Sequence, residues 1–216
     1  MSQRIVLIHA TPLAVAPVNE TFARQWPEAE ISNLLDDALS RDRAKVAALT
    51  PDIYQRIDRL VDYALGLNAT AILFTCSALG EAIDASATKH ALPILKPNEA
   101  MFETALEQGD NIVMLATFAP AVAGMEAEFR EIAAASGSDA TLSTVVVAGA
   151  REALTAGNVT LHNQLLVEAA CQFHYADALL LAHFSMEVAF EEIKAAVSCP
   201  VISSPQAAVK KLKHLD

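Results

Sequence analysis

The sequence predicts an α/β protein made of two pseudo-symmetric, doubly wound domains with mainly parallel sheets and a ligand cleft between them. Short runs rich in β-branched residues alternate with longer amphipathic segments along all 216 residues. The predicted strands are apolar throughout, which is typical of parallel strands that helices cover on both faces. The second part of the chain also repeats the first part, and this repeat indicates two related halves.

The repeat relates three pairs of segments by one shift of 107 residues. Residues 4–12 resemble 111–120, residues 71–79 resemble 178–186, and residues 93–95 resemble 200–202. Short apolar strands often resemble one another by chance, but three pairs at one shift favour a true repeat. We place the halves at 1–98 and 99–204 and expect the final helix, 205–216, to return to the first half.

The expected elements follow from local patterns. Thr50 is suited to cap a helix that begins at Pro51, Asn158 is suited to cap a later helix, and Gly137 predicts a helix end. In the helix after Thr50, apolar residues recur at helical spacing from Ile53 to Leu65. Strands are expected at 4–9, 30–34, 71–75, 93–95, 112–116, 142–147, 178–182 and 200–202. Helices are expected at 17–26, 51–67, 78–88, 97–107, 120–135, 149–156, 159–174, 185–197 and 205–214.

Composition excludes several classes of function. Hydrophobic residues make up 53% of the chain, enough for a substantial core, and the net charge is −11 with no basic patch. We therefore expect no nucleic-acid partner. No apolar run approaches the roughly 20 residues that span a bilayer, and His9 interrupts the N-terminal apolar run too early for a signal peptide. The prediction is a cytoplasmic protein without membrane contact.

The three cysteines, Cys76, Cys171 and Cys199, suggest neither a disulfide framework nor a zinc site. Cys171 lies on the apolar face of its predicted helix, and both it and Cys199 are interpreted as packed. His9 is expected to pack at the end of the first strand. His162 and Glu187 are interpreted as surface positions on helices.

Ligands of open parallel sheets bind at the carboxyl ends of the strands, so the residues after each strand are the candidate site. Apart from Lys96, these positions carry small hydroxyl groups, one thiol and one imidazole. They suit a small carboxylate held by backbone N–H groups and hydroxyl donors. The candidates are Thr11, Thr75, Cys76, Ser77, Ala78, Thr117, Phe118, His183, Phe184 and Ser185.

Cys76 and His183 are counterparts in the repeat, which makes them the candidate catalytic pair. Cys76 lies between a strand and a helix start, so we expect the helix dipole to lower its thiol pKa. The alternative is a buried, inert cysteine. His183 has an ordinary pKa near about 6.5, which suits proton transfer. The alternative for His183 is a hydrogen-bonded structural histidine.

Residues 73–80, 113–118 and 180–186 resemble the aspartate/glutamate/hydantoin racemase superfamily over most of the chain. His9 to Pro12 and Ala16 to Asn19 are similar to the opening of that family. The resemblance implies a cofactor-independent enzyme with a cleft between two halves, and it adds Asn19 to the candidate substrate-binding residues. It also favours a homo-oligomer.

The resemblance implies a pair of cysteines that face opposite sides of a substrate α-carbon, but this chain departs from that pattern. Cys76 matches the first-half cysteine, whereas His183 stands where the second cysteine is expected. The leading hypothesis is therefore a racemase or isomerase that transfers protons at the α-carbon of a small carboxylate through Cys76 and His183. The alternatives are a cysteine-dependent decarboxylase, a covalent cis–trans isomerase of a small dicarboxylate, and a non-catalytic protein that binds a small acid.

Overall fold

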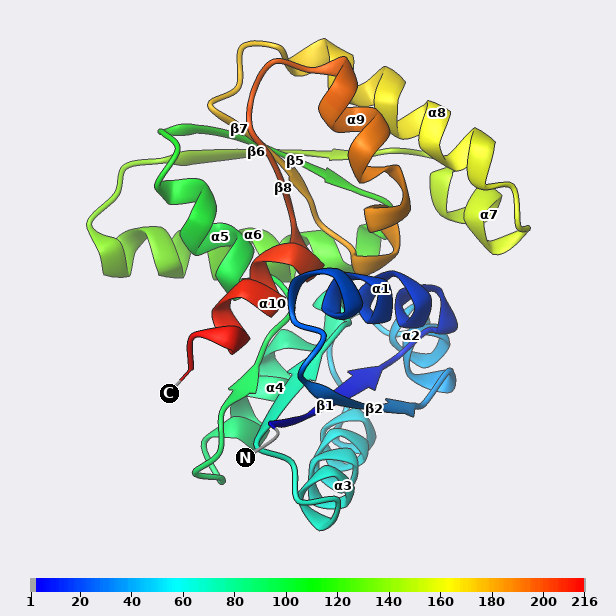
Figure 1. Cartoon of the computed structure of the whole chain (residues 1–216), viewed down its shortest axis with the longest axis vertical. Coiled ribbons are helices and arrows are strands. Elements are labelled where there is room, and N and C mark those ends of the chain that lie inside the picture. The colour runs from blue at the N-terminus through cyan, green and yellow to red at the C-terminus, as the bar shows by residue number, and fades with distance from the viewer. Residues whose placement is uncertain (1–2, 216) are drawn as a thin grey trace.

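The computed structural model describes residues 3–215, which form two sheets of four parallel strands each (Figure 1). In the first sheet the order is β2-β1-β3-β4, and in the second it is β6-β5-β7-β8. The matching orders and the parallel pairing confirm the predicted fold class. The strands are β1 (Arg4–His9), β2 (Glu30–Leu35), β3 (Ala71–Phe74), β4 (Ile94–Leu95), β5 (Asn111–Ala116), β6 (Thr141–Val146), β7 (Ala178–Leu181) and β8 (Val201–Ser203).

The strand register shows the repeat directly. Ile72 pairs with Ile94 in the first sheet, and Leu179 pairs with Val201 in the second. The residue numbers of both members of the first pair are therefore 107 lower than those of the second pair. The crossover to the outer strand differs, because β1 and β2 begin at residues 4 and 30 whereas β5 and β6 begin at 111 and 141. A longer helix accounts for this difference, since α6 has 18 residues and α1 has 11.

Helices cover both faces of each sheet, as continuously apolar strands require. In the first half these are α1 (Val15–Gln25), α2 (Ala38–Arg43), α3 (Pro51–Gly66) and α4 (Gly80–Ala87). The second half has α5 (Glu99–Leu106), α6 (Ala119–Ser136), α7 (Ala150–Thr155), α8 (Val159–Ala170) and α9 (Phe190–Ala196), and α10 (Ser204–Lys213) follows β8. Four short 3₁₀ segments are η1 (Pro12–Ala14), η2 (Ser77–Leu79), η3 (Cys171–Phe173) and η4 (Phe184–Ala189). Of these helices, α2 was not expected from the sequence.

The predicted helix boundaries have the expected chemistry. The Thr50 hydroxyl accepts the Ile53 N–H at 3.4 Å, and the Asn158 side chain accepts the Leu161 N–H at 3.1 Å. Gly137 ends α6 with a φ of 69°, a left-handed conformation that glycine adopts without strain.

The C-terminal helix α10 lies between the two sheets and packs beside α1 (Figure 1). Ala208, Val209 and Leu212 of α10 are buried in one apolar cluster with Val18 and Phe22 of α1. The last helix therefore crosses from the second sheet to the first half of the molecule.

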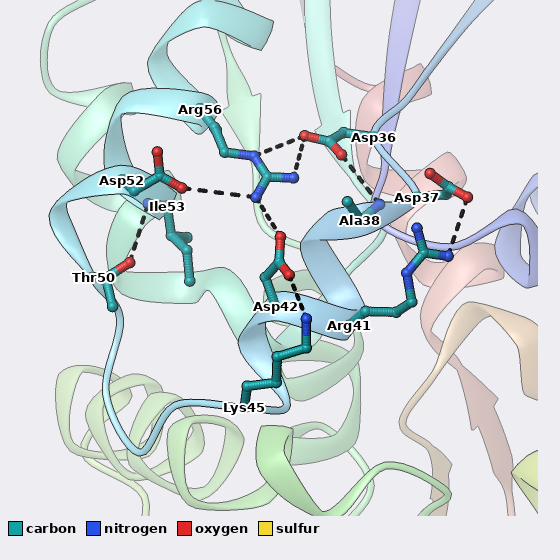
Figure 2. Close-up of polar contacts among 10 residues, drawn as sticks. All are labelled: Asp36, Asp37, Ala38, Arg41, Asp42, Lys45, Thr50, Asp52, Ile53 and Arg56. Atoms are coloured by element: carbon teal, nitrogen blue, oxygen red, sulfur yellow. Dashed lines mark hydrogen bonds and ion pairs between the residues drawn. The ribbon is translucent and has the colours of Figure 1, made fainter.

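An ion-pair network fixes the segment after β2 (Figure 2). Arg56 of α3 donates through Nε and Nη2 to Asp36 at 3.0 and 2.6 Å, and through Nη1 to Asp42 at 2.8 Å. The network ties α2 to the N-terminal part of α3, and α2 carries Ser40 and Arg43 toward the junction of the halves. Asp36 therefore has a structural role as the partner of Arg56.

Three surface or core expectations from the sequence are wrong. Cys171 is exposed, because α8 ends at Ala170 and its helical periodicity stops there. His162 is fully buried, since its Nδ1 contacts the Ala150 carbonyl at 2.8 Å where α7 packs on α8. Glu187 is buried at η4, where Arg24 and Gln206 hold its carboxylate.

No helix in the described part of the chain is long and apolar enough to cross a membrane.

Candidate active site

Cys76 and His183 occupy equivalent places in the two halves. Cys76 follows the fully buried β3 and precedes η2, while His183 follows the fully buried β7 and precedes η4. Both residues have extended backbone conformations, with φ near −120°. Since β3 and β7 are inner strands of their sheets, each side chain emerges at a carboxyl edge, where parallel sheets bind ligands.

The two side chains line one shared cavity. Its volume is about 20 Å³, roughly the space that one water molecule needs. The walls come from both halves, so a substrate enters only when the halves or their side chains move apart. The lining residues are Thr11, Ala14, Ser40, Thr75, Cys76, Ser77, Ala78, Phe118, Ala121, Arg151, His183, Phe184 and Ser185.

Most of the candidate residues named from the sequence are brought together in this cavity. Two are not. Asn19 lies outside the lining and accepts a hydrogen bond from Asn33 at 3.3 Å, and Thr117 is buried without reaching the cavity. Thr117 ends up elsewhere because successive side chains of extended backbone point to opposite sides.

Arg151 is the principal residue that sequence reasoning missed. Among the described residues that line the cavity, it alone carries a charge. It stands 4.4 Å over the Phe118 ring and donates to the Ser40 hydroxyl at 3.1 Å, so it joins the second half to the first. The sequence signal for Arg151 was weak, because this residue does not follow a strand end directly but lies in the first turn of the short helix α7, which Gly149 precedes.

Arg43 braces the same region from α2. Its guanidinium donates to three carbonyl oxygens, those of Ala78 at 3.1 Å, Val46 at 2.8 Å and Pro120 at 3.2 Å. Ala78 belongs to the first half and Pro120 to the second. This arginine therefore holds the Cys76 loop against the N-terminus of α6.

The environment of Cys76 keeps its thiol protonated. Burial raises the pKa of the Cys76 thiol, while a hydrogen bond from the Ala78 N–H and the charges of Arg151 and Arg43 lower it less strongly. The expectation that the helix dipole lowers this pKa is wrong. The thiol is followed by a three-residue 3₁₀ turn, not by a long helix whose dipole could offset desolvation.

His183 is held neutral. Burial and the positive charge of Arg151 lower the pKa of His183 to about 3. Its Nε2 accepts the Phe118 N–H at 3.2 Å, so the ring proton resides on Nδ1. With its ring buried at this cavity, His183 is therefore not the readily titrating group that its sequence position suggested.

The Ser77 hydroxyl donates its hydrogen to buried protein acceptors and so cannot donate it to a ligand in the cavity. This hydroxyl contacts the Asn98 side-chain oxygen at 3.1 Å and the Ala182 carbonyl at 3.3 Å. Asn98 also contacts Ser204 at 3.3 Å, so a buried polar cluster links the Cys76 loop to the residue before His183. Hydroxyls that remain available to an anion belong to Thr11, Ser40 and Ser185.

The described residues contain no group of three or more His, Cys, Asp or Glu side chains arranged to hold a metal ion.

Comparison with known proteins gives matches in structure and none in sequence. No protein-family model and no curated protein matches the chain. An aspartate racemase from Picrophilus torridus superposes with a TM-score of 0.74 at 16% identity, covering 98% of this chain and 94% of that one. A glutamate racemase from Francisella tularensis in complex with D-glutamate superposes with a TM-score of 0.74 at 16% identity, covering 99% and 81%.

The fold is therefore the one that these aspartate and glutamate racemases have. This confirms the resemblance predicted from the sequence, at the level of the fold. A liganded arylmalonate decarboxylase variant, with one glycine changed to cysteine and one cysteine to serine, also superposes. Its TM-score is 0.63 at 20% identity, over 99% of this chain and 92% of that one. Within this racemase fold, the chain presents a thiol on one side of the cavity and an imidazole on the other.

Proposed function

We propose that this protein is a cofactor-independent racemase or isomerase that transfers a proton at the α-carbon of a small carboxylic acid. One observation carries the proposal: Cys76 and His183, related by the internal repeat, line one cavity together with Arg151. Within the racemase fold, that combination supplies a proton-transfer group, a polar group on the facing wall and a cation for the carboxylate.

Arg151 is the proposed carboxylate anchor. Guanidinium groups bind carboxylates through paired N–H donors, and such charge-assisted bonds are stronger than neutral ones. An anionic substrate needs this anchor because the whole chain carries a net charge of −11. The hydroxyls of Ser40 and Ser185 complete the binding of the acid and of the enediolate charge that develops during reaction.

Cys76 is the proposed proton donor and acceptor. A bound carboxylate offsets the charge of Arg151, so a substrate shifts the balance of charges around both Cys76 and His183. For racemisation, the Cys76 thiol proton first passes to Nε2 of His183, which gives up its bond with the Phe118 N–H, and a thiolate and an imidazolium form. The thiolate removes the α-proton from one face, and the imidazolium returns a proton to the opposite face through Nδ1. General acid–base catalysis of this kind contributes typically ~10²–10⁴ in rate.

Decarboxylation is a second candidate, favoured by the state of His183. A neutral imidazole whose Nε2 already accepts the Phe118 N–H is a weak proton carrier. A protonated thiol alone suffices for a one-sided reaction: carbon dioxide leaves a malonic acid, the electron pair forms an enediolate, and Cys76 protonates the α-carbon. Water then returns a proton to the thiolate.

The test is incubation of a panel of amino acids, 2-hydroxy acids and substituted malonic acids in deuterium oxide. Deuterium at the α-carbon with loss of optical purity supports racemisation, and carbon dioxide release with one product enantiomer supports decarboxylation. Cys76→Ala is expected to abolish either activity, and Arg151→Met to raise KM more than it lowers kcat. Arg59→Met, at an exposed position of α3, is the matched control.

Absence of Cys76-dependent exchange and of carbon dioxide release across the panel would refute both reactions. A stable mass increase on Cys76 after substrate trapping would instead assign a covalent cis–trans isomerase. Binding that survives in Cys76→Ala, without turnover in the wild type, would assign a small-acid binding protein.

A further inference from the structure

His9 is a fully buried histidine that lies next to the cavity wall without lining the cavity. It ends β1, and its two ring nitrogens both have partners. Nδ1 lies 2.9 Å from the Thr75 hydroxyl, and Nε2 lies 2.8 Å from the side-chain oxygen of Asn33. Asn33 in turn donates through Nδ2 to Asn19 at 3.3 Å.

These contacts determine where each hydrogen lies. The Asn33 oxygen only accepts, so Nε2 of His9 carries the ring hydrogen and donates it. Nδ1 then carries a lone pair and no hydrogen, so it accepts the hydrogen bond of the Thr75 hydroxyl. The competing acceptor for that hydrogen, the Ile8 carbonyl, is farther away at 3.4 Å. The pKa of His9 is lowered by burial, which agrees with a neutral ring.

Thr75 therefore faces the cavity with its only hydrogen already used. Its oxygen can still accept a hydrogen bond, but it cannot donate one to a carboxylate, contrary to the role expected from the sequence. Thr75 is 5% exposed and directly precedes Cys76. An acceptor that stays unpaired in such a buried place is costly.

We propose that His9 is a positioning residue that fixes Thr75 as a hydrogen-bond acceptor, and that this pair selects acids bearing an N–H or O–H group on the α-carbon. The selection follows because a ligand methyl group would bury the Thr75 oxygen without a partner, which discriminates strongly between otherwise similar ligands. This inference rests on the proposed function, since it assumes that the α-carbon of an acid lies beside Cys76.

The positioning part is tested without any ligand. Imidazole ¹⁵N spectra of the wild-type protein, assigned through bonds, should show His9 with a protonated Nε2 and an unprotonated Nδ1 that accepts a hydrogen bond. The neutral form should persist to low pH. A His9 ring protonated at Nδ1 would overturn the proposal, because Thr75 would then keep its hydrogen for the cavity.

The selectivity part uses matched probes that differ in one group. Isothermal titration would compare 2-hydroxyglutarate with 2-methylglutarate, and malate with 2-methylsuccinate. Of 2-hydroxyglutarate and malate, the one that the wild type binds more tightly should bind at least about tenfold more tightly than its own methyl analogue. Thr75→Val should reduce this ratio to about twofold or less, and Thr75→Ser should retain it. His9→Phe should weaken the ratio, and His9→Gln, which can still accept from Thr75 and donate to Asn33, should restore it.

Equal affinities within each pair for the wild type, or an undiminished ratio in Thr75→Val, would overturn the selectivity claim. Deuterium exchange on the same acids separates this result from failure of the proposed function. Exchange without the preference refutes the His9–Thr75 selection alone, whereas preferential binding without Cys76-dependent exchange refutes the catalytic proposal alone. If no acid of either pair binds, the selectivity claim fails, and the His9 spectra still decide the positioning claim.

Discussion

At the scale of single residues, Cys76 and His183 are both shifted toward their neutral forms by burial. The same desolvation raises the pKa of the thiol and lowers the pKa of the imidazole to about 3. Two groups that attract in their charged forms are thereby kept uncharged until a ligand alters the cavity. Before substrate binds, Cys76 is therefore a protonated thiol, which can donate a proton, and not a thiolate.

Alkylation rates should report the state of Cys76. At neutral pH, iodoacetamide should modify the exposed Cys171 quickly and Cys76 slowly, because only the thiolate reacts and Cys76 is both protonated and enclosed. The rate at Cys76 should rise with a midpoint above about 8.5, the ordinary thiol value. Peptide mass mapping over a pH series measures this, and Cys171→Ser removes the fast site. A Cys76 midpoint below the ordinary value would contradict the assignment.

The sequence sufficed to locate the thiol and the imidazole, because both follow directly on buried strands that the repeat aligns. It did not reveal Arg151, which reaches the cavity from a helix beyond a loop, so only the packing of α7 decides its position. It also did not reveal the direction of the hydroxyl hydrogens. Thr75 and Ser77 are donors by composition, but buried partners such as His9 and Asn98 take their hydrogens.

At the scale of elements, the start of β5 depends on a close contact that requires glycine. Gly109 has a φ of 152°, and a side chain there would place its first carbon 2.5 Å from the Asp177 carboxylate. Asp177 accepts the N–H groups of Asp110 and Asn111 at 3.0 and 2.8 Å, so it holds the first residues of the strand. Neither partner can move without losing these bonds.

Gly109→Ala should therefore destabilise the protein by about 2 kcal/mol or more, the range expected for a strained backbone position. Gly124→Ala is the matched control, since Gly124 lies inside α6 with open space around it. That change should leave stability unchanged or raise it by up to about 1 kcal/mol. Urea denaturation measures both, and equal effects of the two variants would argue against the Asp177 contact.

The contact of α6 with the segment after β4 contains a carboxyl group that titrates near neutrality. Burial raises the pKa of Glu128 to about 7, against the opposing attraction of Lys96 at 3.4 Å, while Asp84 and Glu99 add to the rise. The folded-state pKa exceeds the unfolded value of 4.5, so the bound proton stabilises the fold. That stabilisation is complete below about 4.5 and is lost as the pH rises through about 7.

Glu128→Gln should flatten the pH dependence of unfolding between about pH 5 and pH 8. The removed component amounts to no more than about 3.5 kcal/mol, because a tenfold change in proton affinity corresponds to about 1.4 kcal/mol. Glu131→Gln, at an exposed position of the same helix, should keep the wild-type slope. Urea unfolding midpoints measured across the pH range test both variants. If the midpoint of Glu128→Gln depended on pH as strongly as that of the wild type, the titration would belong to another group.

At the scale of the whole molecule, the two halves meet around a cavity that is too small for any carboxylic acid substrate. Polar contacts join the opposite halves, among them Arg151 with Ser40 in the cavity wall and Arg24 with Glu187 outside it, and Arg43 reaches the Pro120 carbonyl. A shared apolar cluster also crosses the boundary, with Ala78 and Leu79 from the first half and Met125 from the second. Opening therefore breaks a few polar contacts and exposes apolar surface.

Arg43→Met should make opening easier, because it removes the bonds to the Ala78, Val46 and Pro120 carbonyls while keeping much of the side-chain volume. Two effects on Cys76 alkylation then have opposite signs. Loss of the positive charge raises the pKa of Cys76 further, which moves the alkylation midpoint to higher pH. Easier opening raises the plateau rate reached at alkaline pH, where ionisation no longer limits the reaction.

A complete pH profile separates these two effects, whereas a single rate at neutral pH would combine them. Arg59→Met should change neither the midpoint nor the plateau. If Arg43→Met shifts the midpoint and leaves the plateau at the wild-type value, access to Cys76 does not depend on this bridge between the halves. The cavity would then have to open through side-chain motion within one half, and the bonds between α2 and α6 would serve stability alone.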